Sequence, residues 1–517
     1  MAAMLELRSL WELLEARATA TPDALFGVDE RGRTLRFAEL MARAELAAAG
    51  LAATGIESGD VVSWQLPTWF DSAILVVALS RLGAIQNPIL PIYRQREVGF
   101  VCAQAKTKLL VVPGQWRGFD YLEMASQIAA HQPGLEILVV NADAGSPLPE
   151  ADTATLEPVR DAGNEPVRWY FYTSGTTADP KGAQHTDLTV GASAIAMSEC
   201  QDLRPDDRAA LVFPFTHIGG IGWLYNALLV GCQLVFVEAF DAKSTPAFLG
   251  AHDITVAGAG TPFHMAYLAA QRAQPDVPLF PNLRLCTGGG APKPPQLHHD
   301  CKSELGGVGI VSGYGLTEAP IIAMAWTTDA DDVLAETEGR ATRDVQLRAV
   351  ALDGTVCAVG EEGEIRAKGP QLMKGYLDPS LDAAAFDDEG WFRSGDLGTL
   401  DAAGNVRITG RVKDIIIRNM ENISAKELED LLFTHPKVAD VAVVGLPDER
   451  TGERACAVVV AAAHDDAPTL PELNDFLLEH GLMKQKLPEQ LEVLASLPRN
   501  PTGKVVKFEL RAELSKH

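Results

Sequence analysis

The chain has 517 residues, 47% of them hydrophobic, and a formal net charge of −25. This length can bury more than one core, and the negative charge argues against nucleic acid or an anionic membrane as the main partner. The seven cysteines are scattered and contain no Cys-x-x-Cys pair, which favours reduced thiols over a disulfide framework or a zinc site. The longest apolar run, residues 73–79, is too short to span a bilayer. We therefore expect a soluble, cytoplasmic protein without an integral membrane segment.

Helical patterns alternate with short β-branched runs along the first four hundred or so residues. Ser9 and Glu12 form a capping-box pattern that predicts an amphipathic helix ending before Pro22. A helix is expected over 72–84 and a strand over 84–91. Residues 283–292 and 307–318 each predict a buried strand that opens into a glycine-rich loop. This alternation predicts an α/β fold with mainly parallel sheets.

The sequence changes character after Arg411. It predicts strands over 413–418, 438–448 and 454–463 and a helix over 424–435. About 100 residues of this composition suit a small α+β domain of their own. We therefore expect a large N-terminal domain of mixed sheets flanked by helices over 1–411, and a small α+β domain over 412–517.

A hydroxyl-rich loop follows the apolar run 167–172, which predicts a buried strand. Loops at the carboxyl ends of parallel strands are the usual ligand sites of α/β proteins. Hydroxyl groups and free backbone N–H groups here can surround phosphate oxygens, and a lysine adds positive charge. The residues concerned are Thr173, Ser174, Gly175, Thr176, Thr177 and Lys181. The spacing of a Walker A loop is absent, and a flexible polar surface loop is the alternative.

Four further motifs follow this loop in order: 313–318 (GYGLTE), 390–396 (GWFRSGD), 410–414 (GRVKD) and 501–504 (PTGK). Together they resemble the adenylate-forming enzymes, which include acyl-CoA synthetases, peptide adenylation domains and beetle luciferases. The resemblance covers nearly the whole chain. It implies a large N-terminal domain with the ATP and acyl sites, a C-terminal lid that swivels at a hinge, and the use of ATP, Mg²⁺ and coenzyme A.

The resemblance also implies roles for individual residues in binding the nucleotide. The loop from Thr173 to Lys181 would grip pyrophosphate, and Glu318 would bind Mg²⁺ together with Thr173. Thr317 would contact the α-phosphate, and Asp396 would accept hydrogen bonds from the ribose with support from Arg411. The residues expected on the adenine side are Gly289, Gly290, Ala291, Gly313, Tyr314 and Gly315.

Lys504 is the catalytic residue that the resemblance indicates most sharply. It would enter from the lid and hold the carboxylate and the α-phosphate, two mutually repelling anions, at attack distance. Lys413 matches the hinge position. A surface lysine is the alternative interpretation at each of these positions.

The acyl side carries fewer signals. His217, within FPFTHIGGIGW, is the candidate gate between the acyl and CoA entrances, with a structural histidine as the alternative. Residues 218–231 contain no acidic side chain, so an amino-acid substrate would leave its ammonium group unpaired. A fatty or other apolar carboxylic acid fits better. Residues 256–265 resemble a wall of its pocket, and the sequence leaves the shape of the acid open.

Two positions depart from the family pattern: Ala178 replaces a loop glycine, and Asn419-Met420 replaces a glycine pair beside the expected CoA path. The second half-reaction is therefore less firmly implied than the first. An acyl-AMP ligase that loads a carrier protein, and a non-catalytic acyl-AMP or nucleotide binding protein, remain as alternatives. A homodimer is the default expectation for the oligomeric state.

Overall fold

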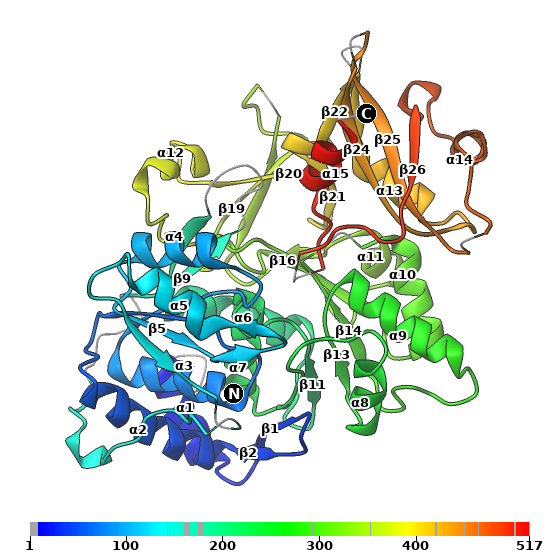
Figure 1. The fold of residues 1–517 in the computed structure, drawn as a ribbon. Coiled ribbons are helices and arrows are strands. Elements are labelled where there is room, and N and C mark those ends of the chain that lie inside the picture. Colours follow the sequence, from blue (N-terminus) through cyan, green and yellow to red (C-terminus); the bar gives the residue numbers. More distant parts are fainter. Residues whose placement is uncertain are drawn as a thin grey trace.

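The computed structural model describes residues 9–515 except 142, 144, 160–165, 174–179, 291–292, 352, 419–420, 449, 464 and 501–502, and only the backbone of residues 421 and 422. Figure 1 shows a large N-terminal part, coloured blue to yellow, and a smaller C-terminal part, coloured orange to red, which lies above the region of α9 (Thr261–Ala273), α10 (Pro295–Asp300) and α11 (Asp331–Glu336). The mixed α/β architecture predicted from the sequence is confirmed.

Two largely parallel sheets form the centre of the N-terminal part. We call the first the central sheet; its strands, in spatial order, are β17 (Arg340–Ala341), β16 (Ala323–Met324), β15 (Ile310–Tyr314), β14 (Leu285–Gly288), β13 (Val256–Ala257), β11 (Arg208–Leu211), β12 (Gln233–Phe236), β1 (Leu25–Asp29) and β2 (Thr34–Arg36). The second sheet contains β10 (Lys181–Thr186), β9 (Val167–Thr173), β4 (Ile85–Pro88), β3 (Val61–Trp64), β5 (Leu109–Val112) and β8 (Glu136–Val139). Pairing is parallel in the middle of each sheet, and antiparallel strands such as β2, β10 and β16 lie at the margins.

Helices pack against both sheets because their apolar residues are buried there. The remaining N-terminal helices are α1 (Leu10–Ala20), α2 (Phe37–Ala53), α3 (Phe70–Leu82), α4 (Gln95–Ala105), α5 (Tyr121–Ala129), α6 (Asp187–Cys200), α7 (Ile218–Val230), α8 (Thr245–Ala251) and the short α12 (Asp382–Ala385). The first predicted helix is confirmed as α1, with Ser9 and Glu12 forming the capping box. The helix expected over 72–84 is α3, and the strands expected at both glycine-rich loops are β14 and β15.

An antiparallel sheet leads to the C-terminal part. Its strands are β18 (Gln346–Val350), β19 (Gly363–Lys368), β20 (Phe392–Leu400) and β21 (Val406–Arg411). A short 3₁₀ turn, Val412–Asp414, follows β21. The C-terminal part then contains β22 (Ile415–Arg418), β23 (Glu421–Ser424), α13 (Ala425–Leu432), β24 (Val438–Asp448), β25 (Gly452–Ala461), α14 (Leu470–Glu479), β26 (Gln490–Val493) and α15 (Lys507–Leu514). These elements agree with the strands and helix predicted beyond Arg411.

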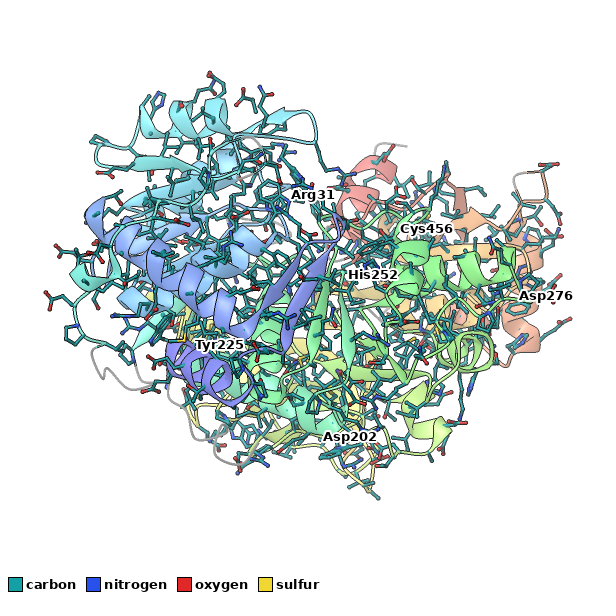
Figure 2. All side chains as sticks on the ribbon, turned by 90° about the horizontal axis from the view of Figure 1, so that it is seen from below. Arg31, Asp202, Tyr225, His252, Asp276 and Cys456 are labelled. Carbon is teal, nitrogen blue, oxygen red and sulfur yellow. The ribbon has the colours of Figure 1, made fainter. Side chains whose placement is uncertain are left out.

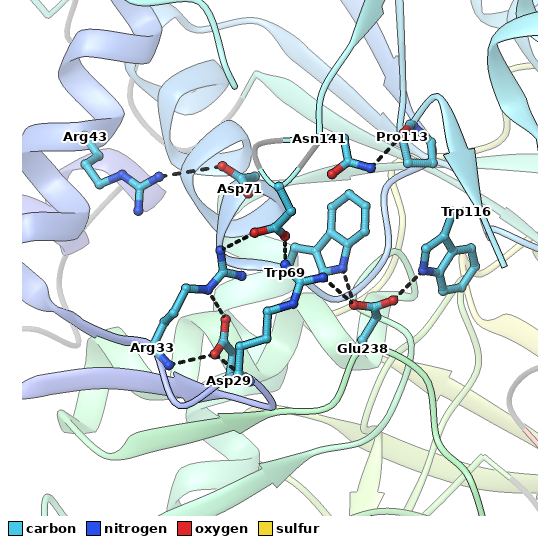
Figure 3. A network of polar contacts seen from close by, with 11 residues as sticks. Asp29, Arg33, Arg43, Trp69, Asp71, Pro113, Trp116, Asn141 and Glu238 are labelled. Carbon is cyan, nitrogen blue, oxygen red and sulfur yellow. Dashed lines mark hydrogen bonds and ion pairs between the residues drawn. The ribbon is translucent and has the colours of Figure 1, made fainter. Parts of the chain in front are cut away.

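A polar network ties the turn after β1 to the neighbouring elements. The indole N–H groups of Trp69 and Trp116 donate to the two carboxylate oxygens of Glu238, at 2.8 and 2.5 Å. Trp69 is the N-cap residue of α3, and Trp116 lies on a small hairpin, β6 (Gln115–Trp116) and β7 (Phe119–Asp120). Arg33 pairs with Asp29 at the end of β1 (Figure 3). Glu238 follows the end of β12, so the network fixes this hairpin and α3 against the carboxyl end of that strand.

Asp187 connects strand β9 of the second sheet to helices α1 and α7 inside the core. Its side chain is 7% exposed and accepts hydrogen bonds from Trp169 Nε1, Tyr225 Oη and the backbone N–H of Leu10. These donors come from β9, α7 and α1, so one carboxylate links three elements.

Among the described residues, no helix combines the length and apolar character needed to cross a membrane.

Replacing Asp187 with alanine leaves three donors without their acceptor in the core. We expect the free energy of unfolding to fall by at least about 3 kcal/mol, because each lost bond exposes a desolvated donor. Urea titration followed by tryptophan fluorescence measures the change. Asp276→Ala, at an exposed position on the rim of the molecule (Figure 2), is the matched control and is expected to change stability by less than about 0.5 kcal/mol. A loss at Asp187 as small as that of the control would contradict its anchoring role.

Candidate active site

Asp396 lies between two donors that arrive from different strands. It stands on β20, 7% exposed, opposite Arg411 of β21. Arg411 Nε donates to Asp396 Oδ1 at 2.6 Å, and the hydroxyl of Tyr314 donates to Oδ2 at 2.8 Å. Burial raises the pKa of Tyr314 well above its ordinary value, and the adjacent Asp396 carboxylate raises it further. The phenol of Tyr314 therefore stays protonated and remains a donor. The structure thus joins three residues that the sequence assigned to the nucleoside.

The loop after β15 presents Thr317 and Glu318 in a fixed conformation. The amide of Ile322 donates to the carbonyl of Tyr314, which closes the loop. A Cβ on Gly315 would lie 2.3 Å from the amide nitrogen of Ile321, so only glycine fits there. Glu318 Oε1 accepts a hydrogen bond from the hydroxyl of Tyr376 at 2.7 Å. Both expected phosphate-side residues are therefore held before any ligand arrives.

Two supporting residues in this region were not predicted from the sequence. His185 Nε2 donates to the carbonyl of Thr317 at 2.9 Å, and burial lowers the pKa of His185 to about 4, so the ring is neutral. Tyr376 follows Lys374 and Gly375 in a segment with no strong motif. For the first residue the sequence gives no clear signal, because burial along β10 does not alternate and both His185 and Thr186 are buried. The glycine before Tyr376 is a weak signal for the second.

Thr173 and Lys181 mark the two ends of the hydroxyl-rich loop. They lie opposite each other where the antiparallel strands β9 and β10 meet the loop. Several residues singled out from the sequence lie outside the described residues: Ser174, Gly175, Thr176, Thr177, Ala291, and the three that differ from the family pattern, Ala178, Asn419 and Met420. Lys181 Nζ lies 5.6 Å from the ring centroid of Tyr376. Lys181 therefore lies next to Tyr376, the residue whose hydroxyl bonds Glu318.

The glycines expected at the adenine side follow β14 and lie beside the end of β15. Gly289 and Gly290 both have positive φ, and Gly313 is within β15. A Cβ on Gly289 would lie 3.0 Å from the carbonyl oxygen of Gly313. The two strand ends therefore approach each other closely, and a side chain at Gly289 would crowd the backbone of Gly313.

His217 is the N-cap residue of α7 and borders a small hollow. Its Nδ1 accepts from the amide of Gly219 at 3.0 Å, and its ring lies 4.9 Å from that of Phe213. Burial lowers the pKa of His217 to about 4, so it is neutral near pH 7. The hollow is mostly apolar, with walls from the end of β4, α4, β9 and the start of α7, and Thr317 also lines it. It therefore adjoins the phosphate side of the site.

Lys504 reaches the nucleoside residues from the C-terminal part. Its amide donates to Asn500 Oδ1 at 2.9 Å, and its carbonyl accepts from the amide of Asn500 at 2.9 Å, which fixes the turn. Burial lowers the pKa of Lys504 to about 8, and the positive charge of Arg411 lowers it further. The negative charge of Asp396 acts in the opposite direction and raises this pKa. Lys413, in the Val412–Asp414 turn, also lowers this pKa. The structure thus brings together Lys504, Arg411 and Asp396, which are separated by up to 108 residues in sequence.

The turn that contains Lys504 touches the wall of the expected acyl pocket. Gly503 has φ +81°, and a Cβ placed on it would lie 2.3 Å from Cγ of Pro262, at the start of α9. This contact leaves no room for a side chain. With Pro262 opposite, only glycine at position 503 allows the observed approach of the C-terminal part.

Glu318 is the carboxylate expected to bind a metal ion here. Among the described residues, no group of three or more His, Cys, Asp or Glu side chains is arranged to hold a metal. Mg²⁺ is commonly held by one or two carboxylates together with the phosphate oxygens of a nucleotide, and Glu318 fits that use.

Residues 14–377 match the family described as AMP-binding enzyme, and residues 427–504 match its C-terminal domain. The chain belongs to the AMP-binding enzyme family. The resemblance to adenylate-forming enzymes drawn from the motifs is confirmed. Relatives named as CoA ligases, together with the match to an enzyme family, show that this protein is an enzyme.

Three relatives of this AMP-binding enzyme illustrate its range. The medium-chain fatty-acid–CoA ligase of Escherichia coli (strain K12) is 32% identical, over 98% of this chain and 90% of its own. The salicyl-AMP ligase / salicyl-S-ArCP synthetase of Mycobacterium tuberculosis (strain ATCC 25618 / H37Rv) is 34% identical, over 98% and 91%. ATP-bound MatB from Rhodopseudomonas palustris is 26% identical over 98% and 99%, with a TM-score of 0.87, whereas the apo structure of that protein gives 0.76.

Enlarging Gly503 is expected to impair the pose in which Lys504 enters the site. Gly503→Ala places a Cβ against Pro262, so we expect adenylation to slow by about tenfold or more. Pyrophosphate release measures this step. The matched control is Gly481→Ala, where φ is +83° and nothing lies within 4 Å of the added Cβ. Equal effects of the two substitutions would mean that backbone strain, and not the contact with Pro262, is responsible.

The pKa of Lys504 predicts the pH dependence of adenylation. Because that pKa is about 8, the free enzyme loses this cation as the pH rises through 8, and kcat/KM for ATP should fall there. Lys504→Arg stays charged and should lose this alkaline decline in its residual activity. A pH profile of ATP–pyrophosphate exchange decides the point. A wild-type profile that stays flat to pH 10 would refute the assignment.

Proposed function

We propose that this AMP-binding enzyme is an ATP-dependent carboxylic acid–CoA ligase. The carboxylate of the acid attacks the α-phosphorus of ATP, which forms acyl-AMP and releases pyrophosphate. The thiol of coenzyme A then attacks the acyl carbonyl and releases AMP. The observation that carries the first step is the arrival of Lys504 from the C-terminal part beside Asp396 and Arg411.

In the first step Lys504 supplies the charge that brings two anions together. Asp396 would accept the ribose hydroxyls, and Thr317 would contact the α-phosphate. Lys181 and the loop that begins at Thr173 would hold the departing pyrophosphate. Glu318 would bind Mg²⁺, which supplies neutralisation of phosphate charge when bound. Placement of donors before the reaction reduces the reorganisation that the transition state requires.

In the second step the C-terminal part would act as a lid. We assign residues 1–411 to the domain with the ATP and acyl sites and 412–517 to the lid, with the hinge at Lys413. Support comes from the exposed 3₁₀ turn at Val412–Asp414, the one backbone connection between the two parts in the described chain. Rotation there would withdraw Lys504 and free the face of the acyl-AMP for the thiol.

The acid is expected to have an apolar body. Helix α7 carries no acidic side chain, so an ammonium group on the substrate would have no partner from it. The hollow beside His217 has mainly apolar walls and leads to Thr317. The name of the Escherichia coli relative, a medium-chain fatty-acid–CoA ligase, supports a fatty acid as the first substrate to test.

Loading of a carrier protein is the second candidate function. It is favoured by the salicyl-AMP ligase / salicyl-S-ArCP synthetase, which is 34% identical to this chain. Measuring AMP release with a fatty acid and either coenzyme A or a phosphopantetheinylated carrier protein distinguishes the acceptors. Turnover with coenzyme A supports the ligase, and turnover with the carrier alone overturns it.

Replacing Lys504 should separate the half-reactions. In Lys504→Ala we expect adenylation to fall by about 100-fold or more, because no cation offsets the repulsion between the carboxylate and the phosphate. Thioester formation from synthetic acyl-AMP and coenzyme A should be largely preserved. Single-turnover assays of pyrophosphate and acyl-CoA measure the two steps. Unchanged pyrophosphate release would end the proposed role of Lys504.

A further inference from the structure

We propose that Tyr376 is a positioning residue for nucleotide activation, which orients Glu318 through its hydroxyl and supports Lys181 with its ring. This inference rests on the proposed function, because it assigns phosphate-side roles to both partners. It concerns a residue outside the motifs that carried the sequence prediction.

The hydroxyl of Tyr376 fixes one oxygen of Glu318. Tyr376 is 6% exposed, and its O–H donates to Oε1 at 2.7 Å. The backbone of Glu318 is held as well, because its carbonyl accepts from the amide of Met373 at 2.8 Å. A carboxylate restrained at both ends has one predetermined orientation. A single hydrogen bond from a neutral phenol still leaves acceptor capacity on Glu318 for a cation.

The ring of Tyr376 faces the cation at the end of the hydroxyl-rich loop. Lys181 Nζ lies 5.6 Å from the ring centroid, within the range of a cation–π interaction. Lys181 is also the first residue of β10 and pairs with Thr173 at the mouth of the loop. The side chain of Tyr376 therefore contacts Lys181, the proposed phosphate-binding cation, with its ring. Its hydroxyl contacts Glu318, the proposed metal-binding carboxylate.

The backbone of Tyr376 is itself fixed against β10. Its amide donates to Asp382 Oδ1 at 2.8 Å, and its carbonyl accepts from Gln184 Nε2 at 3.0 Å. On either side, the amide of Gln184 donates to the carbonyl of Gly375, and the amide of Leu377 donates to the carbonyl of Gly182. Tyr376 is thus carried by a strand-like segment that is bonded to the strand of Lys181.

This arrangement sets the spacing between Lys181 and Glu318. Charge on the β- and γ-phosphates is neutralised well only if the cation and the metal-binding carboxylate stand at a defined separation. Without the phenol, Glu318 keeps its charge but loses the restraint on its orientation. The effect should therefore appear in the use of Mg²⁺, with a much smaller effect on the binding of the nucleoside.

The test is calorimetric titration of the full-length protein with ATP, once with excess MgCl₂ and once with EDTA, in the absence of acid and coenzyme A. Tyr376→Phe keeps the ring and removes the hydroxyl. We expect its affinity for metal-free ATP to remain at the wild-type value and the gain in affinity on adding Mg²⁺ to fall by about tenfold. Tyr376→Leu should in addition weaken metal-free ATP binding by about threefold, because Lys181 loses the aromatic face.

Tyr225→Phe is the matched control. Tyr225 also donates to a buried carboxylate, Asp187, at 2.8 Å, and Figure 2 shows it in the N-terminal part, well away from Cys456 in the C-terminal sheet. It should lose stability without any change in the Mg²⁺ dependence. An Mg²⁺ gain in Tyr376→Phe equal to that of the wild type would overturn the inference.

A double-mutant cycle with Glu318→Gln provides the second readout. The effects of Tyr376→Phe and Glu318→Gln on the Mg²⁺ gain should be strongly non-additive, and additive effects would contradict the inference. A wild-type protein that binds no ATP would contradict the proposed function itself, whereas normal ATP binding with equal Mg²⁺ dependence would contradict only the role of Tyr376.

Discussion

The whole site depends on the buried carboxylate of Asp396. Arg411 and Tyr314 each bind one of its oxygens, so a β-hairpin of the antiparallel sheet and a strand of the central sheet meet at one point. Its negative charge also partly offsets the cost of bringing Lys504 near Arg411 and Lys413. The position of the C-terminal part over the site is thus coupled to the residues expected to hold the ribose.

This coupling explains how a chain with a net charge of −25 can handle an anionic nucleotide. Attraction is local: Lys504, Arg411 and Lys413 converge on a small region, where Asp396 and Asp414 offset part of their positive charge. The lowered pKa of Lys504 means that its charged form is less favoured in this pose without ligand than it would be in water. An added carboxylate and phosphate would favour the charged form, so ligand binding and the approach of the proposed lid should stabilise each other.

Much of this site could be predicted from sequence because the relevant residues sit in short, ordered motifs. Glycine and hydroxyl residues at strand ends indicated where β9, β14 and β15 open into loops, and the capping box of α1 follows from local spacing. Tyr376 and His185 escaped prediction because their partners Glu318 and Thr317 are 58 and 132 residues away in sequence, respectively. The pose of the C-terminal part was equally out of reach, since it depends on the close contact of Gly503 with Pro262.

That contact also offers the most direct measurement of the central claim, that one pose of the lid serves adenylation and must be left for thioester formation. A Cβ on residue 503 would lie 3.6 Å from Cβ of Pro262, which is close to the spacing of about 3.8 Å in a disulfide. We expect the oxidised Pro262→Cys/Gly503→Cys protein to release pyrophosphate in a single turnover and to form acyl-CoA only after reduction. Acyl-CoA formation at an undiminished rate by the oxidised protein would contradict the account.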